Sequence, residues 1–268
     1  MQTETEYIRE QRLFHGMVPR VMGTKLELMT VGTEEDVARN TWNEICADAE
    51  RLDSMLNRFS PESEISKINA MHGCDRLKIS SELLDILRLS IDYWYRTEGL
   101  FDITRGRMTE LSLTDEGLLT ISSPELTLDF GGIAKGYLQA RTEAKLRRSG
   151  AECAFVDFGN SAILAIGHHP FGDSWRVSLP NPYNGAILDE FQIRDRALST
   201  SGNTPGYTGH IVHPLTGKAN VERKIVSVTD RSALDAEVLS TALMIADEGQ
   251  RLRIGRSFPA AQIKTYHL

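Results

Sequence analysis

The chain has little cysteine and no long apolar run, and each shortage excludes a class of protein. Its 268 residues include three cysteines, Cys46, Cys74 and Cys153, which are odd in number and widely spaced. That spacing supports neither a disulfide framework nor a thiolate metal site. No apolar run approaches the roughly 20 residues that a membrane-spanning helix needs, so we expect no transmembrane segment.

Basic residues are also in deficit, because 30 Lys and Arg face 37 Asp and Glu and give a net charge of −7. No basic block is interleaved with aromatic residues, so we expect no nucleic-acid partner. The polar start, Met1 to Glu6, lacks the basic region and apolar core of a secretory signal. The sequence as written therefore indicates a cytoplasmic protein. A periplasmic or other extracytoplasmic location is expected only if a leader was removed.

What remains is an ordinary globular composition, with 41% hydrophobic and 25% charged residues. The order of polar and apolar residues predicts a polar N-terminal tail over residues 1–20 and a single domain over residues 21–268. No linker, internal repeat or low-complexity segment interrupts that domain.

Apolar periodicity predicts both helices and strands. Helices are expected over 34–59, 81–98, 134–149 and 233–247, with a loop and a short helix within 60–69. Strands are expected over 21–31, 126–130, 154–158, 162–166, 175–179, 186–193 and 225–229. Because helices and strands occur in groups, we predict an α+β fold with a largely antiparallel sheet and packed helices.

The segment from Leu126 to Tyr137 reads LTLDFGGIAKGY and combines a predicted strand, two glycines and a helix start. The glycines allow a ligand to approach the backbone, and the helix beginning at Ala134 offers free N–H groups to an anion. Lys135 adds a positive charge. The segment is thus a candidate phosphate site, although a tight turn between strand and helix can contain Gly-Gly for structural reasons alone.

Glu237 and Thr241 are four residues apart on the last predicted helix, so their side chains share one face. A carboxylate and a hydroxyl are oxygen ligands of the kind that Mg²⁺ prefers. The alternative is a solvated helix face. Just before them, Ser232 and Asp235 have the spacing of a capping box, which gives Asp235 a structural role.

Two further segments contain candidate polar groups. Residues 197–203 read ALSTSGN and are expected to form a hydroxyl-rich loop, able to bind phosphate or sugar oxygens or to act as a plain turn. His210 and His213 flank a short predicted strand. Their odd spacing directs them to opposite faces, so we do not expect a shared metal. One of them is a candidate general base and the other a structural residue.

Taken in order, these motifs resemble one family, the ApbE-type FAD:protein FMN transferases. The resemblance spans most of the chain. The matching segments are 22–24, 59–69, 101–104, 128–137, 199–202, 210–217, 227–229 and 237–241.

The resemblance implies a T-fold-like α+β protein that binds FAD as its substrate, with Mg²⁺ on the pyrophosphate. It implies transfer of FMN to a threonine or serine of an acceptor flavoprotein, with AMP as the leaving group. His210 matches the proposed base. The implied FAD contacts are Met22, Phe59, Leu100, Phe101, Asp102, Asp129, Lys135 and Val212. The implied metal ligands are the carbonyl of Gly132 and the side chains of Glu237 and Thr241.

Two positions depart from the family pattern, because relatives usually carry aspartate where this chain has Glu237 and His213. Two other functions therefore stay open at this point. One is hydrolysis of FAD to FMN and AMP, with water in place of the acceptor. The other is FAD binding without catalysis.

Overall fold

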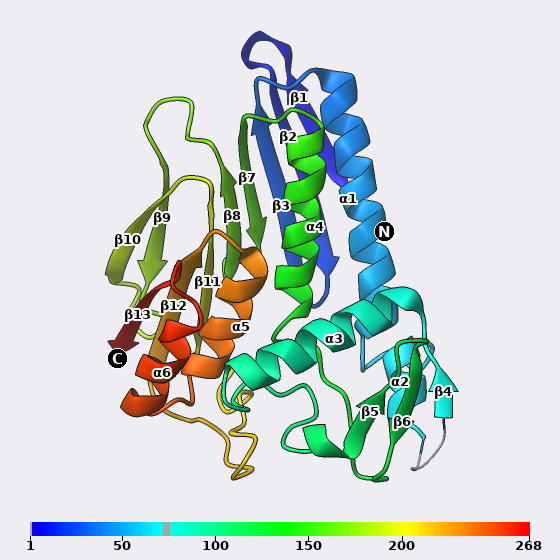
Figure 1. The fold of residues 1–268 in the computed structure, drawn as a ribbon. Helices are drawn as coiled ribbons and strands as arrows, with labels where there is room; N and C mark the ends of the chain where they lie inside the picture. The colour runs from blue at the N-terminus through cyan, green and yellow to red at the C-terminus, as the bar shows by residue number, and fades with distance from the viewer. Residues whose placement is uncertain (1, 72–75) are drawn as a thin grey trace.

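An antiparallel sheet of eight strands runs through the protein in the order β1-β2-β3-β7-β8-β11-β12-β13 (Figure 1). The structure is a computed structural model that describes residues 2–71 and 76–268. Cys74 lies outside these residues, and Cys46 and Cys153 are free thiols. The strands of the sheet are β1 (Glu4–Ile8), β2 (Leu13–Val21), β3 (Thr24–Val31), β7 (Cys153–Phe158), β8 (Ala162–Ile166), β11 (Arg196–Gly202), β12 (Lys224–Asp230) and β13 (Gln262–His267).

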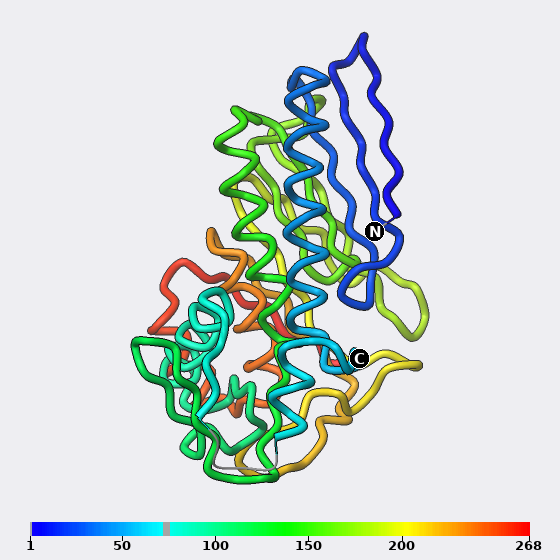
Figure 2. The backbone as a smooth tube through the Cα atoms, turned by 90° about the vertical axis from the view of Figure 1, so that its right-hand side faces the viewer, coloured from blue at the N-terminus to red at the C-terminus, as the bar shows by residue number. Residues whose placement is uncertain are grey.

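Three helices pack on one face of this sheet: α1 (Glu35–Leu56), α4 (Ala134–Arg148) and α5 (Ala233–Leu243) (Figures 1 and 2). In α1 the buried residues Ile45, Ala49, Leu52 and Leu56 recur every three or four positions, which gives the helix one apolar side. Helix α4 lies between α1 and α5 and contacts both.

The opposite face carries a hairpin of β9 (Trp175–Pro180) and β10 (Ile187–Ile193). Trp175 and Phe191 of the hairpin pack with Ile163 and Leu198 of the sheet in a second, smaller apolar cluster. The sheet is thus covered on both faces where these strands lie, which explains why β8 is buried along its whole length.

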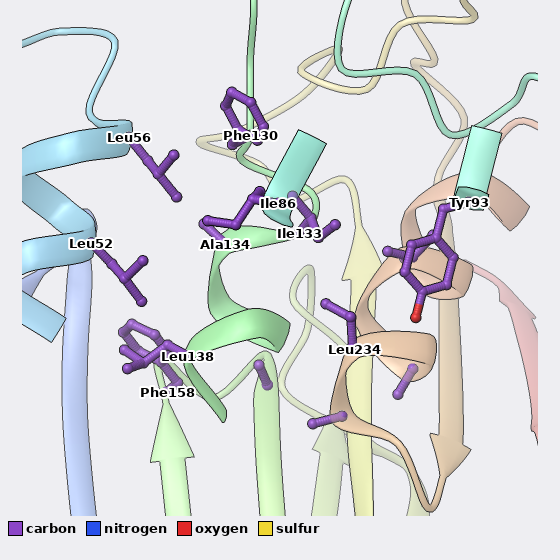
Figure 3. Close-up of a cluster of buried hydrophobic side chains, with 14 of the residues drawn as sticks. Leu52, Leu56, Ile86, Tyr93, Phe130, Ile133, Ala134, Leu138, Phe158 and Leu234 are labelled. Carbon is purple, nitrogen blue, oxygen red and sulfur yellow. The ribbon is translucent and has the colours of Figure 1, made fainter. Parts of the chain in front are cut away.

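A smaller unit lies across one end of α1 and α4 (Figure 1). It contains α2 (Glu64–Asn69), α3 (Ser81–Arg96) and a three-stranded sheet of β4 (Arg76–Lys78), β6 (Leu118–Ile121) and β5 (Leu111–Leu113). Side chains from α1, α3, α5 and the start of α4 meet in one buried cluster that joins this unit to the main sheet (Figure 3). Helix α6 (Glu248–Arg256) leads into β13, and short 3-10 helices occupy Arg9–Gln11 and Met108–Glu110.

Within the part of the chain that the structure describes, no helix has the length and apolar character needed to cross a bilayer. The α+β class and the antiparallel sheet are as predicted, and α1, α3 and α4 agree with their predicted ranges to within a few residues at each end.

The predicted polar tail is wrong, because residues 4–8 and 13–21 form β1 and β2. β1 is an edge strand with exposed or half-buried residues throughout, so it shows no apolar alternation. Its place in the sheet depends on pairing with β2, from Glu4 opposite Met17 to Ile8 opposite Leu13.

The predicted strand over 126–130 is also wrong, although its residues alternate between buried and exposed as a strand would. No strand within the described residues pairs with it. Instead the side-chain amide of Asn69 accepts a hydrogen bond from the backbone N of Leu128 at 2.7 Å and donates to its carbonyl at 3.0 Å. The backbone N of Asp129 donates to the carbonyl of Ile103 at 2.8 Å. These isolated hydrogen bonds replace the strand pairing that the sequence pattern predicted.

Two boundaries differ near the C-terminus. Residues 197–202, predicted as a loop, belong to β11, which pairs with both β8 and β12. The last predicted helix ends at Leu243 rather than residue 247, and α6 begins at Glu248 behind a capping box formed by Asp247 and Gln250. One of the two hydrogen bonds of the predicted capping box at α5 is present: the side chain of Ser232 accepts from the backbone N of Asp235.

Candidate functional site

The start of α4 is an open helix terminus. Of the helices that the structure describes, α4 alone begins with neither a side-chain cap nor an acidic residue in its first turn. Phe130, Ile133 and Ala134 fix this terminus in the buried cluster between α1 and α3 (Figure 3). The N–H of Ala134 already donates to the carbonyl of Phe130 at 2.9 Å. The following N–H groups of the first turn and the positive end of the helix dipole are available to an anion.

Two glycines bring α5 against this terminus. A Cβ placed on Gly132 would lie 3.2 Å from Cγ2 of Thr241 and 3.2 Å from Cε2 of Phe101. A Cβ placed on Gly136 would lie 2.7 Å from Cβ of Glu237, closer than side chains pack. The absence of a side chain at both positions thus allows Glu237 and Thr241 to lie beside the first turn of α4.

Glu237 is held by one cation and one hydroxyl. Its Oε1 lies 2.9 Å from Nζ of Lys135, and its Oε2 accepts a hydrogen bond from Oγ of Ser199 at 2.6 Å. Only 4% of the Glu237 side chain is exposed, against 20% for Lys135. Lys135 also donates to Oγ of Ser161 at 2.8 Å. This carboxylate is buried but fully paired, as a buried charge must be.

A chain of hydroxyl groups connects Glu237 to Thr241. Oγ of Ser240 lies 2.9 Å from Oγ of Ser199 and 2.9 Å from Oγ of Ser201. Oγ of Ser201 lies 3.5 Å from Oγ1 of Thr241. Ser199 and Ser201 are two residues apart on β11 and so face α5 together. The hydroxyls of Ser199 and Ser201, which we predicted to lie on a loop, therefore belong to strand β11 and line one side of the site.

Asp102 and Asp129 shape the turns around Gly131 and Gly132, the two glycines before α4. Asp102 accepts from the backbone N and the hydroxyl of Thr104, at 2.7 and 2.5 Å, and from the backbone N of Gly106 at 3.0 Å. Asp129 accepts from the backbone N of Gly131 at 3.0 Å and from Arg105 at 2.6 Å. Their carboxylates are used within the fold, so both act first as organisers of the site.

Phe59 is 81% exposed and rests against the guanidinium of Arg58, which lies 4.5 Å from its ring centroid. Nε of Arg58 lies 3.5 Å from the carboxylate of Asp129. Through Arg58 and Asp129, this exposed ring is linked to Gly131 in the turn before α4. An aromatic face open to solvent is available for stacking on a planar ligand.

Met22 occupies the tight turn between β2 and β3 with a positive φ of 49°. A side chain on Gly159 would overlap Thr24, so this turn lies against the turn that carries Ser161, the partner of Lys135. Leu100 and Phe101, at 2% and 4% exposure, are buried residues of the main core.

His210 lies on the loop between β11 and β12. Its ring stacks on Tyr207, with centroids 4.0 Å apart, and its buried Nδ1 has no hydrogen-bond partner in the described chain. Burial lowers the pKa of His210 from its usual 6.5, and the backbone of Tyr207 acts in the opposite direction as the smaller cause. The imidazole is therefore neutral near pH 7, as a general base must be.

One buried side chain closes this loop at its base. Asn203 is 0% exposed and donates to the carbonyls of Asn220 and Glu222, at 2.9 and 2.8 Å, while its Oδ1 accepts from the backbone N of Gly209. Asn220 donates in turn to the carbonyl of Met244 at the end of α5. These contacts anchor the loop that carries His210 to the helix that carries Glu237 and Thr241.

His213 has a structural role. Its Nδ1 accepts from the backbone N of Leu215 at 3.3 Å, two residues ahead, as an aspartate oxygen does in an Asx turn. The turn places the carbonyl of Pro214 against Gly106, where any side chain would overlap it. Between the two histidines, Val212 forms only an isolated bridge with Ala219, so the short strand predicted there is wrong.

The donor set around Glu237 fits Mg²⁺ in kind. The Glu237 carboxylate and the Thr241 hydroxyl of α5, together with the Gly132 backbone just before α4, offer oxygen donors of the kind that Mg²⁺ prefers. The Lys135 ammonium on Glu237 shows that this carboxylate is placed to hold a positive charge. Across residues 2–71 and 76–268 there is no cluster of three or more His, Cys, Asp or Glu able to hold a metal. Any metal here would depend on neutral oxygens as well.

The structure thus brings together Gly132, Lys135, Glu237, Thr241 and Phe101 around the start of α4. No contact links His210 directly to these residues, and the loop anchors described above connect them. Sequence reasoning missed Arg58, Ser161 and Ser240. The alternation of Ser199 and Ser201 was a usable signal, since on a strand it places both on one face.

Three comparisons with known proteins point to one family. The sequence model described as the ApbE family matches residues 22–118 and 108–263. An FAD:protein FMN transferase of Vibrio cholerae serotype O1 is 26% identical over 248 residues, covering 78% of this chain and 74% of the relative. One from Rhodobacter capsulatus is 28% identical, covering 87% of this chain and 52% of the relative.

Solved structures resemble this fold over nearly its whole length. The flavin transferase ApbE from Vibrio cholerae superposes with a TM-score of 0.82 at 21% identity, covering 98% of this chain and 97% of the other. The corresponding protein from Thermotoga maritima gives a TM-score of 0.79 at 19% identity, with 99% and 97% covered. At such identity these two likenesses establish the fold.

Proposed function

This chain belongs to the ApbE family, and on that basis we propose that it is an FAD:protein FMN transferase. In this reaction it would move FMN from FAD to a threonine or serine hydroxyl of an acceptor protein. The observation that carries the proposal is the open start of α4 beside Glu237 and Thr241. A helix terminus that can bind an anion and oxygen donors for a counter-ion suit a pyrophosphate, and this arrangement supports the proposal.

The proposed reaction is a single displacement at phosphorus. The acceptor oxygen forms a bond to the phosphorus of the FMN half, the bridging P–O bond of the pyrophosphate breaks, and AMP leaves with the bridging oxygen. When bound to Gly132, Glu237 and Thr241, Mg²⁺ would neutralise developing charge on the phosphate oxygens. The chain itself supplies binding, orientation and one proton acceptor.

His210 is the proposed proton acceptor. Burial keeps its imidazole neutral, so the ring can take the proton of the acceptor hydroxyl as the new P–O bond forms. Tyr207 stacks on the ring and limits its orientation. Phe59 is proposed to stack on the isoalloxazine ring, and Met22, Leu100, Phe101, Asp102, Asp129, Lys135 and Val212 are proposed to complete the FAD site.

The deciding assay incubates the protein with FAD, MgCl2 and an acceptor domain from a flavinylated protein. We expect a covalently fluorescent acceptor band and an equal amount of AMP. AMP formed without acceptor would indicate hydrolysis of FAD. FAD binding without AMP under any metal tested would indicate a binding protein and overturn the proposal.

Replacing Glu237 with alanine should abolish metal-dependent transfer, a loss of about 100-fold or more, because it removes the one charged ligand of the proposed Mg²⁺ site. The acceptor fluorescence assay measures it over a series of MgCl2 concentrations, with thermal unfolding as a check on the fold. Unchanged turnover in this variant would remove Glu237 from the site.

A further inference from the structure

Lys135 occupies the oxygen of Glu237 that a metal ion would use. Its Nζ lies 2.9 Å from Oε1, while Oε2 is taken by the hydroxyl of Ser199 at 2.6 Å. The carboxylate is 4% exposed. A buried carboxylate needs a compensating partner, and the ammonium supplies it at this oxygen.

The ammonium is also able to leave. Lys135 is part of the first turn of α4, its side chain is 20% exposed, and its other partner is the neutral hydroxyl of Ser161. A lysine head group on a flexible stem can turn outward without moving the helix. Glu237 and Ser199, by contrast, are fixed by burial on α5 and β11.

A second cation on the same oxygen would be repelled by the ammonium at close range, in a site shielded from water. The two cannot both hold Oε1. We propose that Lys135 is an internal counter-ion of Glu237, and that a divalent cation binds this site by displacing the Lys135 ammonium. This inference rests on the metal site of the proposed function and adds that Lys135 and the metal ion compete for Glu237.

Displacement of Lys135 from Glu237 would free its ammonium to bind phosphate. The released ammonium stays at the open start of α4, where the helix terminus already attracts an anion. Metal binding would then provide a positive group for the phosphates at the moment the metal arrives. Without metal the same group is engaged with Glu237.

The test is calorimetric titration of the FAD-free protein with Mn²⁺ and with Mg²⁺. Lys135→Met removes the competitor, so its metal affinity should rise about tenfold over wild type. Lys145→Met is the matched control. That lysine lies on the same helix, 15% exposed, 3.3 Å from Asp48 and remote from Glu237. Its removal should leave metal affinity unchanged.

Lys135→Gln is the second variant, because it keeps a hydrogen-bonding group for Ser161 and guards against a folding defect in Lys135→Met. Equal or weaker metal binding by the Lys135 variants would overturn the inference while leaving the metal site intact. Glu237→Gln should lose metal binding. If Glu237→Gln binds metal as tightly as wild type does, Glu237 is not a metal ligand. In that case the proposed metal site is wrong, which is a different failure from that of the Lys135 inference.

Discussion

Two buried carboxylates pair with cations of α4, and they do so in different ways: Asp48 of α1 along the helix, and Glu237 of α5 at its start. Along the interface with α1, Asp48 is contacted by three cations, with Arg51 at 2.7 Å, Arg141 at 3.0 Å and Lys145 at 3.3 Å. At the start of the helix, Lys135 is the one cation paired with Glu237 among the residues that the structure describes. The loop residue His210 has a buried nitrogen with no partner in the described chain.

The number of partners separates groups that stabilise the fold from groups that can bind a ligand. A carboxylate shared by several cations loses little when one is removed, so it serves the stability of the interface. A group with one partner or none can exchange that partner for a ligand, at the cost of a less favourable folded state. Three test substitutions, two of them with a control variant, examine this division, beginning with the one expected to have the largest effect.

His210→Ala should reduce FMN transfer by about 10³-fold, because the acceptor hydroxyl loses its proton acceptor. Since burial lowers the pKa of His210 from 6.5, the wild-type imidazole is neutral above that value. Wild-type activity should fall only as pH drops below 6.5, and the variant should lack this acid limb. Initial rates of acceptor flavinylation measured across pH check both points.

His213→Asn is the control on the same loop. Its amide oxygen can still accept from the backbone N of Leu215, so the turn is kept and activity should stay near wild type. If both variants lose activity equally, the loop geometry rather than the His210 imidazole carries the effect.

Gly136→Ala should lower both stability and metal affinity. The new methyl group would lie 2.7 Å from Cβ of Glu237 and 3.0 Å from the carbonyl of Ala233, so α4 and α5 must separate. Overpacking of this kind costs about 1–3 kcal/mol in unfolding free energy. Urea denaturation and metal titration measure the two effects.

Gly255→Ala provides the comparison, because Gly255 lies within α6 and a Cβ there would meet no atom within 4 Å. That substitution should stabilise the protein by about 0.5–1 kcal/mol. Equal stability changes in the two glycine variants would contradict the close approach of α4 to α5.

Asp48→Asn should cost about 1 kcal/mol of unfolding free energy at neutral pH and leave transfer activity unchanged. Burial raises the pKa of Asp48, but hydrogen bonds from Arg141 and Arg51 outweigh it and hold the pKa below its usual 3.8. The contribution of Asp48 to stability is therefore present above 3.8 and lost as pH falls through the lower, folded-state pKa.

Urea denaturation over a range of pH measures this term, and wild type and variant should converge in acid. A difference that persists there would mean that Asp48 acts through packing rather than charge. A loss of transfer activity at room temperature would break the division between the two ends of α4.

Helices of this protein were predictable where their own residues define them. The end of α4 at Arg148, with basic residues in its last turn and Gly150 beyond, follows from local rules. Other elements depend on distant partners. β1 shows no apolar pattern and is a strand only because β2 pairs with it, while residues 126–130 have the pattern but no neighbouring strand, since Asn69 satisfies Leu128.

The features of the site also fall into those that depend on one element and those that depend on contacts between elements. The four-residue spacing of Glu237 and Thr241 was visible because it lies within one helix. The pairing of Glu237 with Lys135 depends on how α4 and α5 cross, and the facing of Ser199 toward Glu237 depends on β11 being a strand. Spacing along the chain defines neighbours on one element, and contacts between elements come only from the tertiary structure.

The closure of the His210 loop by Asn203 has a practical consequence for protein engineering. One amide binds both strands of the loop at its base, at Gly209 and at Asn220 and Glu222. Residues 204–208 could therefore be exchanged between related proteins while the sheet beneath stays intact, provided that Tyr207 is kept to stack on His210. Chimeras that keep Asn203 and Asn220 would allow the outer surface of this loop to be varied without rebuilding the rest of the molecule.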